Sequence, residues 1–188
     1  MEQFDWGSEL PTLHGRRVNL RWLTQDDAPE VFAVFGDPEV VRFWSSPPFP
    51  DVAAAVALID QVQELFKARR LYQWGICSPE TGKVLGTCTL FNINAAHRRA
   101  EIGFAVARAN WGTGLGAEAV ALLIGFAFAT LDLHRLEADV DPQNARSLRL
   151  LERQGFQREG YLRERWHLPG KVYDAVYLGL LAHEWKRA

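Results

Sequence analysis

The feature that most constrains this chain is a glycine-rich segment followed by a long apolar run. Gly112, Gly114 and Gly116 fall within five residues, and the stretch 117–130 that follows carries one charged side chain, Glu118. Glycines directly before a helix let successive backbone N–H groups converge on one point, where the helix N-terminus adds partial positive charge. A helix this apolar must lie against a sheet. The segment therefore predicts an α/β fold with a phosphate-bearing ligand at a strand–helix junction.

The kind of phosphate is not fixed by the glycines alone. A Walker A loop is excluded, because no Gly-Lys-Ser/Thr follows. The dinucleotide fingerprint fits in form, since Gly112, Gly114 and Ala117 have its spacing and Glu137 lies 20 residues beyond Ala117. Too few residues follow for the βαβ units that such a fold needs, and they predict a terminal hairpin instead. Glycines that only turn the chain are the other alternative.

The remaining patterns predict one α/β domain. Helices are expected from Thr24 to Asp37, where Thr24 and Asp27 cap the start, and over 51–69, 117–130 and 144–154. Alternating or β-branched runs predict seven strands, at 18–23, 72–77, 84–91, 100–106, 134–141, 156–166 and 172–181. No repeat or linker interrupts this order. We expect a mixed sheet in a single domain over 1–188, with about 1–12 as an N-terminal extension.

Charge and cysteine content exclude several classes of protein. Lys and Arg number 21 against 23 Asp and Glu, whereas a dedicated nucleic-acid binder would be clearly basic. The two cysteines form no disulfide framework, and neither lies near a histidine at metal-binding spacing; pairing of Cys77 with Val84 would place Cys88 opposite Gln73. The first ten residues lack an apolar signal region, and the run 119–131 is too short to span a bilayer. We expect a cytoplasmic protein that binds no metal, nucleic acid or membrane.

Four motifs in order resemble the GNAT N-acetyltransferases. They are Ala100-Glu-Ile-Gly-Phe104, Trp111-Gly-Thr-Gly-Leu-Gly116, Asn144-x-x-Ser147 and Glu152-x-x-Gly155-Phe156. Within that superfamily the chain is most similar to the ribosomal-protein N-terminal acetyltransferase branch, the RimJ/RimL type, whose start and end resemble 17–23 and 177–185. The resemblance covers roughly 13–185 and implies a mostly antiparallel sheet with splayed central strands, and acetyl-CoA as co-substrate.

The resemblance assigns the acetyl-CoA site to the glycine loop and the strand before it. The family loop begins with Arg or Gln, and here Trp111 stands in that position, so less side-chain help is expected at that corner. The strand 100–106 is expected to bulge and to part from 134–141, which opens a slot for the pantetheine arm. An N–H near Phe104 and Ala105 would face the thioester carbonyl. The residues expected to bind the co-substrate are Phe104, Ala105, Val106, Trp111, Gly112, Thr113, Gly114, Leu115, Gly116, Ala117, Asn144 and Ser147.

The helix that begins after Asn144 carries a second group of candidates. Asn144 is a good N-cap, and the resemblance also gives it a bond to the pantetheine amide; both roles are compatible. Ser147 is not explained by capping, which would favour Glu or Gln there. In much of the superfamily a Tyr one turn later protonates the leaving thiolate, and its counterpart here is Leu151. The resemblance then implies that Ser147 is the acid or holds the CoA sulfur.

Two carboxylates are candidates for the base. Glu101 alternates with Ile102 and Phe104, which look core-facing, so its side chain is expected to point into the cleft, where many relatives use a Glu through a water. The alternative is a solvated carboxylate, or one held by Arg99 or His97. Glu164 is the second candidate, as base or acceptor ligand. His97, His134 and His183 are expected at the surface.

The acceptor is expected to bind between the loop after the first helix and the terminal hairpin. The acceptor-binding candidates are Arg42, Trp44, Tyr161, Glu164 and Trp166. The expected reaction is acetyl transfer to a primary amine, most simply the N-terminal α-amine of a protein or peptide. The alternatives are a small-molecule amine such as a polyamine, aminoglycoside or amino acid, and an acyl-CoA-binding module without turnover. The chain is expected to be a monomer or a homodimer.

Overall fold

A computed structural model of the chain describes residues 7–168 and 170–186 and contains one mixed eight-stranded sheet with four α-helices. Residues 1–6 of the expected N-terminal extension lie outside the described residues, whereas Leu10 is buried in the core. The strands are β1 (Leu13–His14), β2 (Asn19–Arg21), β3 (Tyr72–Cys77), β4 (Val84–Asn94), β5 (Arg99–Val106), β6 (Arg135–Val140), β7 (Gln157–Leu168) and β8 (Lys171–Leu181). The helices are α1 (Ala28–Phe35), α2 (Val52–Lys67), α3 (Leu115–Ala129) and α4 (Ala145–Arg153), with short 3-10 turns at Gln25–Asp27 and Arg108–Asn110.

The sheet order is β1-β2-β3-β4-β5-β6-β8-β7, and every neighbouring pair is antiparallel except β5 with β6. The eighth strand corrects the expected count of seven. It is β1, a two-residue strand in which Leu13 pairs with Leu20 and His14 with Asn19. Two residues are too short to produce a periodic pattern, so the sequence offered no signal for it.

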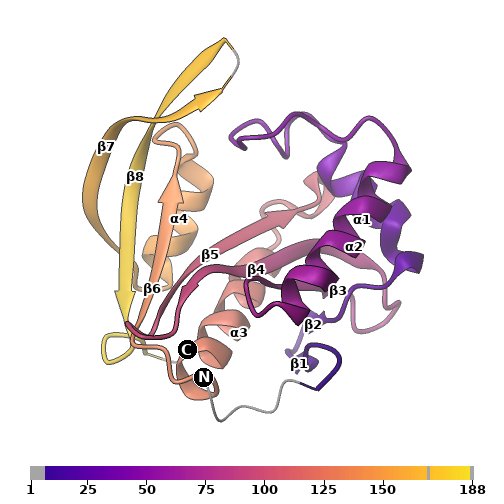
Figure 1. Cartoon of the computed structure of the whole chain (residues 1–188), viewed down its shortest axis with the longest axis horizontal. Coiled ribbons are helices and arrows are strands. Elements are labelled where there is room, and N and C mark those ends of the chain that lie inside the picture. The colour runs from indigo at the N-terminus through magenta and orange to yellow at the C-terminus, as the bar shows by residue number, and fades with distance from the viewer. Residues whose placement is uncertain (1–6, 169, 187–188) are drawn as a thin grey trace.

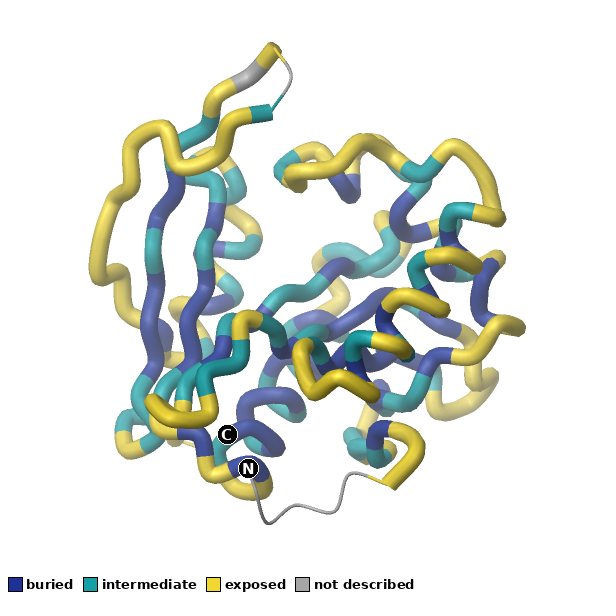
Figure 2. The backbone as a smooth tube through the Cα atoms, viewed as in Figure 1, coloured by how far each residue is buried: buried dark blue, intermediate teal, exposed yellow. Residues whose placement is uncertain are grey.

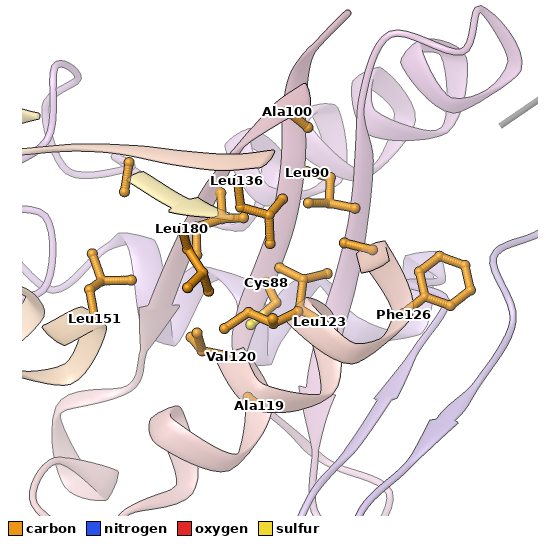
Figure 3. Close-up of a cluster of buried hydrophobic side chains, with 14 of the residues drawn as sticks. Cys88, Leu90, Ala100, Ala119, Val120, Leu123, Phe126, Leu136, Leu151 and Leu180 are labelled. Atoms are coloured by element: carbon orange, nitrogen blue, oxygen red, sulfur yellow. The ribbon is translucent and has the colours of Figure 1, made fainter. Parts of the chain in front are cut away.

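The helices cover the two faces of the sheet. Helices α1 and α2 pack on β3, β4 and β5 through a cluster that includes Val31, Val34 and Ile59. Helix α3 packs on the other face, where Val120 and Leu123 lie beside Cys88 of β4 (Figure 3). The Phe126 ring of the same helix packs edge-on against Trp74 of β3, with 5.4 Å between the ring centres. Helix α4 lies beside α3, since Gln154 Nε2 donates to the Ala117 carbonyl at 3.1 Å. The apolar run of α3 is thus buried as expected.

Local signals explain where the elements begin and end. Asp51 caps α2, because its Oδ1 accepts from the Ala54 N–H at 3.0 Å. Asn144 caps α4 in the same way, and Gly155 follows that helix with a φ of +99°. The β3–β4 register differs from the expectation: a bulge between Ile76 and Cys77 places Cys88 opposite Trp74, not Gln73. The two thiols remain free and buried.

The terminal hairpin of β7 and β8 is the most exposed part of the fold. β7 is exposed along almost its whole length, and its outer edge has no strand neighbour among the described residues (Figure 2). β8 is buried where it pairs with β6. The hairpin therefore forms one edge of the sheet and faces the segment between α1 and α2 (Figure 1).

Candidate active site

The central strands part in the middle of the sheet. β5 and β6 pair only at Arg99 with Arg135, Ala100 with Leu136 and Glu101 with Glu137, and then diverge toward Val106 and Val140 (Figure 1). Beyond Glu101, the backbone N–H and C=O groups that alternate toward β6 have no strand partner. The splay predicted from the sequence is therefore present, and it leaves polar backbone open to a ligand.

The expected bulge lies on the neighbouring strand. β5 pairs with β4 without interruption from Glu101 to Val106, whereas β4 carries an extra residue between Phe91 and Asn94. Asn92, in this bulge, has a φ of +48°. Asparagine tolerates the left-handed region better than most residues. The expectation of a bulge in 100–106 is thus corrected: the bulge is in β4, opposite the start of β5.

The glycine loop offers free backbone donors at the wide end of this gap. Gly112 and Gly114 have φ values of +76° and +86°, and nothing lies within 4 Å of a Cβ built at Gly112. In the described part of the chain, the N–H groups of Gly112, Thr113 and Gly114 have no hydrogen-bond partner. The Arg17 guanidinium holds the loop, because its Nη2 donates to the Thr113 carbonyl at 2.5 Å. Helix α3 begins at Leu115. Free donors, open space and a helix start are what an anionic phosphate needs.

Trp111 ties the loop to its two neighbours. Its indole Nε1 donates to the Val106 carbonyl at 2.8 Å, which fixes the ring against the end of β5. The guanidinium carbon of Arg146, on α4, lies 4.5 Å from the centre of the ring. The Arg146 guanidinium therefore lies beside position 111, where the family pattern has Arg or Gln, although the residue at that position is aromatic.

Two cavities meet beside the splay. The larger, about 830 Å³, is lined by the glycine loop, the end of β5 and one face of α4. The smaller, about 370 Å³, lies between the β4 and β5 surface, the end of β6 and the terminal hairpin. Residues that line both cavities are Phe43, Trp44, Phe104, Asn144 and Ser147. A ligand can therefore occupy the larger cavity and present one end to a second molecule in the smaller.

Asn144 and Ser147 stand at this junction because α4 begins there. Asn144 Oδ1 accepts from the Ser147 N–H at 3.2 Å, so the cap uses the amide oxygen and leaves the NH₂ group for a ligand. The Ser147 hydroxyl makes no hydrogen bond within the described residues. Leu151, one turn later, is buried and lines the smaller cavity, but its aliphatic side chain has no acidic group that could protonate a thiolate.

Glu101 lines the smaller cavity at the last paired position of β5. Its Oε1 accepts from Asn92 Nδ2 at 3.0 Å, across the β4 bulge. Arg99 and His97 do not hold it: Arg99 binds Glu137, while His97 is exposed and uses its backbone N–H on Asn94. Phe104, which we expected to face the core, packs against the core and also lines both cavities.

The acceptor candidates divide into three groups. Trp44 and Trp166 line the smaller cavity, and Trp166 Nε1 donates to Asp139 Oδ1 at 3.1 Å. Arg42 lines only the larger cavity. Tyr161 and Glu164 line neither cavity. Both bind the Asp174 carboxylate instead: the Tyr161 hydroxyl donates to Oδ2 at 2.6 Å, and the Glu164 backbone N–H donates to Oδ1 at 2.8 Å.

Sequence reasoning missed several residues that line the smaller cavity. Asp174, Asp141 and Asp139 supply carboxylates there, and Phe91 and Tyr173 supply aromatic surface. The hydrogen bonds that Asp174 accepts from Tyr161 and from the Glu164 N–H lower the pKa of its carboxyl. No sequence motif marks these residues, because they come from β4, from β6 and the residue after it, and from β8, which meet only in the folded sheet.

Glu137 decides against the dinucleotide interpretation. It is 5% exposed and is bonded by Arg99 Nη1 at 2.5 Å and Arg135 Nε at 2.8 Å. Burial raises the pKa of its carboxyl, but the hydrogen bonds from Arg135, Tyr177 and Arg99 outweigh burial, and the net pKa is lowered. A carboxylate engaged in this way is not available to a ribose hydroxyl.

Metal-binding and membrane-spanning features are both absent from the described residues. Across residues 7–168 and 170–186, no three His, Cys, Asp or Glu side chains are grouped so as to hold a metal ion. Over the same ranges, no helix has both the length and the apolar character needed to cross a bilayer.

Comparison with known proteins gives a consistent result. Residues 17–157 match the acetyltransferase (GNAT) domain family. The uncharacterized N-acetyltransferase p20 of Bacillus licheniformis is 36% identical over 94% of this chain and 99% of its own. The spermidine N(1)-acetyltransferase of Escherichia coli K12 is 26% identical over 94% of this chain and 91% of its own. The ribosomal protein uS5-alanine N-acetyltransferase of the same strain is 27% identical over 69% of this chain and 67% of its own. A Gcn5-related N-acetyltransferase from Brucella melitensis has a TM-score of 0.83 at 25% identity, covering 93% of this chain and 80% of that one.

Proposed function

The chain belongs to the acetyltransferase (GNAT) domain family and is an N-acetyltransferase, and from that premise we propose that it acetylates the N-terminal α-amine of a peptide or protein. The observation that carries the proposal is the pair of cavities that meet at Phe104, Asn144 and Ser147. One has the free N–H groups that a phosphate needs, and the other has a carboxylate, Glu101, and aromatic walls. Such a pair suits a donor and an acceptor that meet end to end.

The residues of the larger cavity fit acetyl-CoA, which supplies the acetyl thioester. The loop from Gly112 to Ala117 would hold the pyrophosphate on free N–H groups. The unpaired edge of β5 from Phe104 to Val106 would bond the pantetheine arm as a strand would, with Asn144 Nδ2 on its amide. An N–H at Phe104 or Ala105 would stabilise negative charge on the carbonyl oxygen.

Glu101 is the base in this proposal, because it lines the smaller cavity and Glu164 does not. It would take the proton of the attacking amine, directly or through a water, while the bond from Asn92 keeps its carboxylate in place. Ser147 would hold or protonate the departing sulfur, since Leu151 cannot. A hydroxyl is a weak acid, so this contribution is smaller than that of the base.

The chemistry of the amine favours an α-amine over a lysine. Attack requires a neutral amine, and at pH 7.5 roughly a quarter of α-amines are neutral but only about one lysine in a thousand. An enzyme without a tyrosine acid gains from the amine that loses its proton more easily. Trp44 and Trp166 on the walls of the smaller cavity suit the first side chain of a peptide.

A second acceptor class is favoured by a specific observation. Glu101, Asp141 and Asp174 all line the smaller cavity, and a protonated second amine would be attracted to them. A relative 26% identical over 94% of this chain is a spermidine N(1)-acetyltransferase. A small polyamine is therefore the competing acceptor.

The two classes are separated by direct competition. Equal amounts of a lysine-free peptide with a free N-terminus, an N-blocked lysine peptide and spermidine are incubated with enzyme and acetyl-CoA at pH 7.5, and the products are measured by mass spectrometry. We expect the free N-terminus to be acetylated fastest. Faster acetylation of spermidine would refute the peptide proposal and support the polyamine. Faster lysine acetylation would refute the argument from amine ionisation.

A further inference from the structure

Strand β7 contains a long bulge beside the smaller cavity. β7 pairs with β8 up to Leu162 and again from Trp166, so residues 163–165 face Asp174 alone on β8. We call residues 163–165 the β7 bulge. Glu164, at its centre, has a φ of +53°. Extra residues in one strand bend that strand and change where its side chains point, and such bulges are common beside active sites.

Two carboxylates from neighbouring strands hold the β7 bulge. Asp174 of β8 accepts the backbone N–H of Glu164 at 2.8 Å. At the end of the bulge, Asp139 of β6 accepts from Arg165 Nε at 2.9 Å and from Trp166 Nε1 at 3.1 Å, with one bond on each carboxylate oxygen. Since β8 lies between β6 and β7 in the sheet, these two side chains reach across a whole strand.

Asp139 is placed to receive them because it lies past the point where the central strands part. The last paired position of β5 and β6 is Glu101 with Glu137, and Asp139 follows two residues later on β6. Its side chain is 6% exposed and lines the smaller cavity. A carboxylate this buried requires hydrogen-bond donors. Both donors that its side chain has among the described residues come from β7.

Trp166 depends on this anchor because packing does not enclose its ring. The residue is 42% exposed, so its neighbours restrain rotation of the ring only weakly. The bond to Asp139 fixes the indole N–H, and the Arg165 guanidinium lies 5.3 Å from the centre of the ring. Both contacts lead to the same carboxylate, since Asp139 also holds Arg165. The place of Trp166 on the wall of the smaller cavity therefore depends on Asp139.

We propose that Asp139 is a positioning residue for the acceptor: it holds Trp166 as the wall against which the amine-bearing substrate binds. The proposal rests on the proposed acetylation of a peptide N-terminus and adds a residue of β6 to the acceptor site. Asp139 lines only the smaller cavity, so its loss should weaken acceptor binding without affecting donor binding. Direct contact between Asp139 and the acceptor is the alternative, and a double variant distinguishes the two.

Steady-state kinetics with a lysine-free peptide test this role. Loss of a hydrogen bond to a charged group predicts about a tenfold rise in the peptide KM for Asp139→Ala and for Trp166→Phe, with kcat within about threefold. The double variant should have the KM of Trp166→Phe alone, since Asp139 acts through that ring. Glu152→Ala is the matched control and should leave the peptide KM unchanged. Glu152 also accepts from the Nε of a β7 arginine, Arg158, at 2.7 Å, but it lines neither cavity.

Two kinetic results would overturn the proposal. An unchanged peptide KM in Asp139→Ala would show that acceptor binding does not depend on this carboxylate. A double variant in which the two KM effects multiply would show that Asp139 acts on the acceptor without Trp166. Binding of CoA, measured by calorimetry, should be the same in Asp139→Ala as in the wild-type protein, which also checks that the variant is folded.

A spectroscopic measurement separates this role from the function on which it rests. The indole N–H of Trp166 gives one nuclear magnetic resonance signal, which is identified by its loss in Trp166→Phe. In Asp139→Ala that signal should move upfield, because the hydrogen bond to the carboxylate is gone. A signal that stays in place would overturn the proposal whatever the kinetics. A protein that shows the shift but acetylates no peptide would support the role of Asp139 in placing Trp166 and refute the proposed function.

Discussion

At the scale of single residues, the sharpest test is the carboxylate at the start of the splay. Glu101→Gln keeps the shape of the side chain and its contact with Asn92 but removes the base. We expect kcat to fall about 100-fold, with the KM for acetyl-CoA little changed. Glu164→Gln is the matched control, because that side chain lines neither cavity, and kcat should stay within about twofold. The reverse pattern in steady-state kinetics would assign the base to Glu164.

Some of the site residues could be predicted from the sequence and others could not. Ser147, Asn144 and the glycines lie in contiguous motifs, so the order of residues along the chain is enough to mark them as candidates. Asn92 and Asp174 carry no such mark, because each reaches the site through tertiary structure. Asn92 does so through a bulge that shifts the register of β4, and Asp174 by facing inward from β8. Tyr161, a predicted acceptor residue, instead holds Asp174 in position.

At the scale of the elements, the closed end of the splay is held by Glu137 of β6. It joins Arg99 of β5 to Arg135, whose guanidinium also contacts Glu159 of β7. The lowered pKa means that the charged form is favoured in the folded state. This stabilisation is present above the usual glutamate value near 4.5 and is lost as pH falls below it.

Replacing this carboxylate should therefore change how stability depends on pH. Glu137→Gln is expected to lower the unfolding free energy at pH 7 by about 2 kcal/mol, or roughly 4–8 °C in Tm, because charged hydrogen bonds are lost. It should also flatten the fall in Tm between about pH 5 and 3. Glu159→Gln is the control: its side chain is 38% exposed, so a smaller loss is expected. Thermal scans with the same acid slope in wild type and Glu137→Gln would contradict the assignment.

The elements themselves were largely predictable. β3 was predicted with its observed bounds and the other long strands to within a few residues, because their alternation and turn residues are strong signals. The register of Cys88 was wrong by one, since a bulge at Ile76 and Cys77 leaves no mark in composition. Helix α3 begins two residues earlier than expected, because Gly114 in the left-handed region acts as its N-cap.

At the scale of the whole molecule, ligand binding and folding are linked. A ligand that binds only the folded state at 100 times its Kd stabilises it by about 2.7 kcal/mol. For a chain of this length we expect a rise in Tm of roughly 5–10 °C with CoA. Gly112→Glu should abolish that rise, because a carboxylate would occupy the phosphate position and repel the ligand. Substitution at a φ of +76° also strains the backbone, so a matched control is needed.

Gly82 provides that control. Its φ is +70°, nothing lies within 4 Å of a Cβ built there, and it belongs to the β3–β4 turn, which lines neither cavity. Gly82→Glu should therefore lower the Tm of the free protein about as much as Gly112→Glu does, yet keep the full rise with CoA. Thermal scans of the three proteins with and without CoA separate strain from binding. If Gly112→Glu keeps the rise in Tm, the glycine loop is not the phosphate site; if wild type shows no rise at millimolar CoA, the donor assignment itself is wrong.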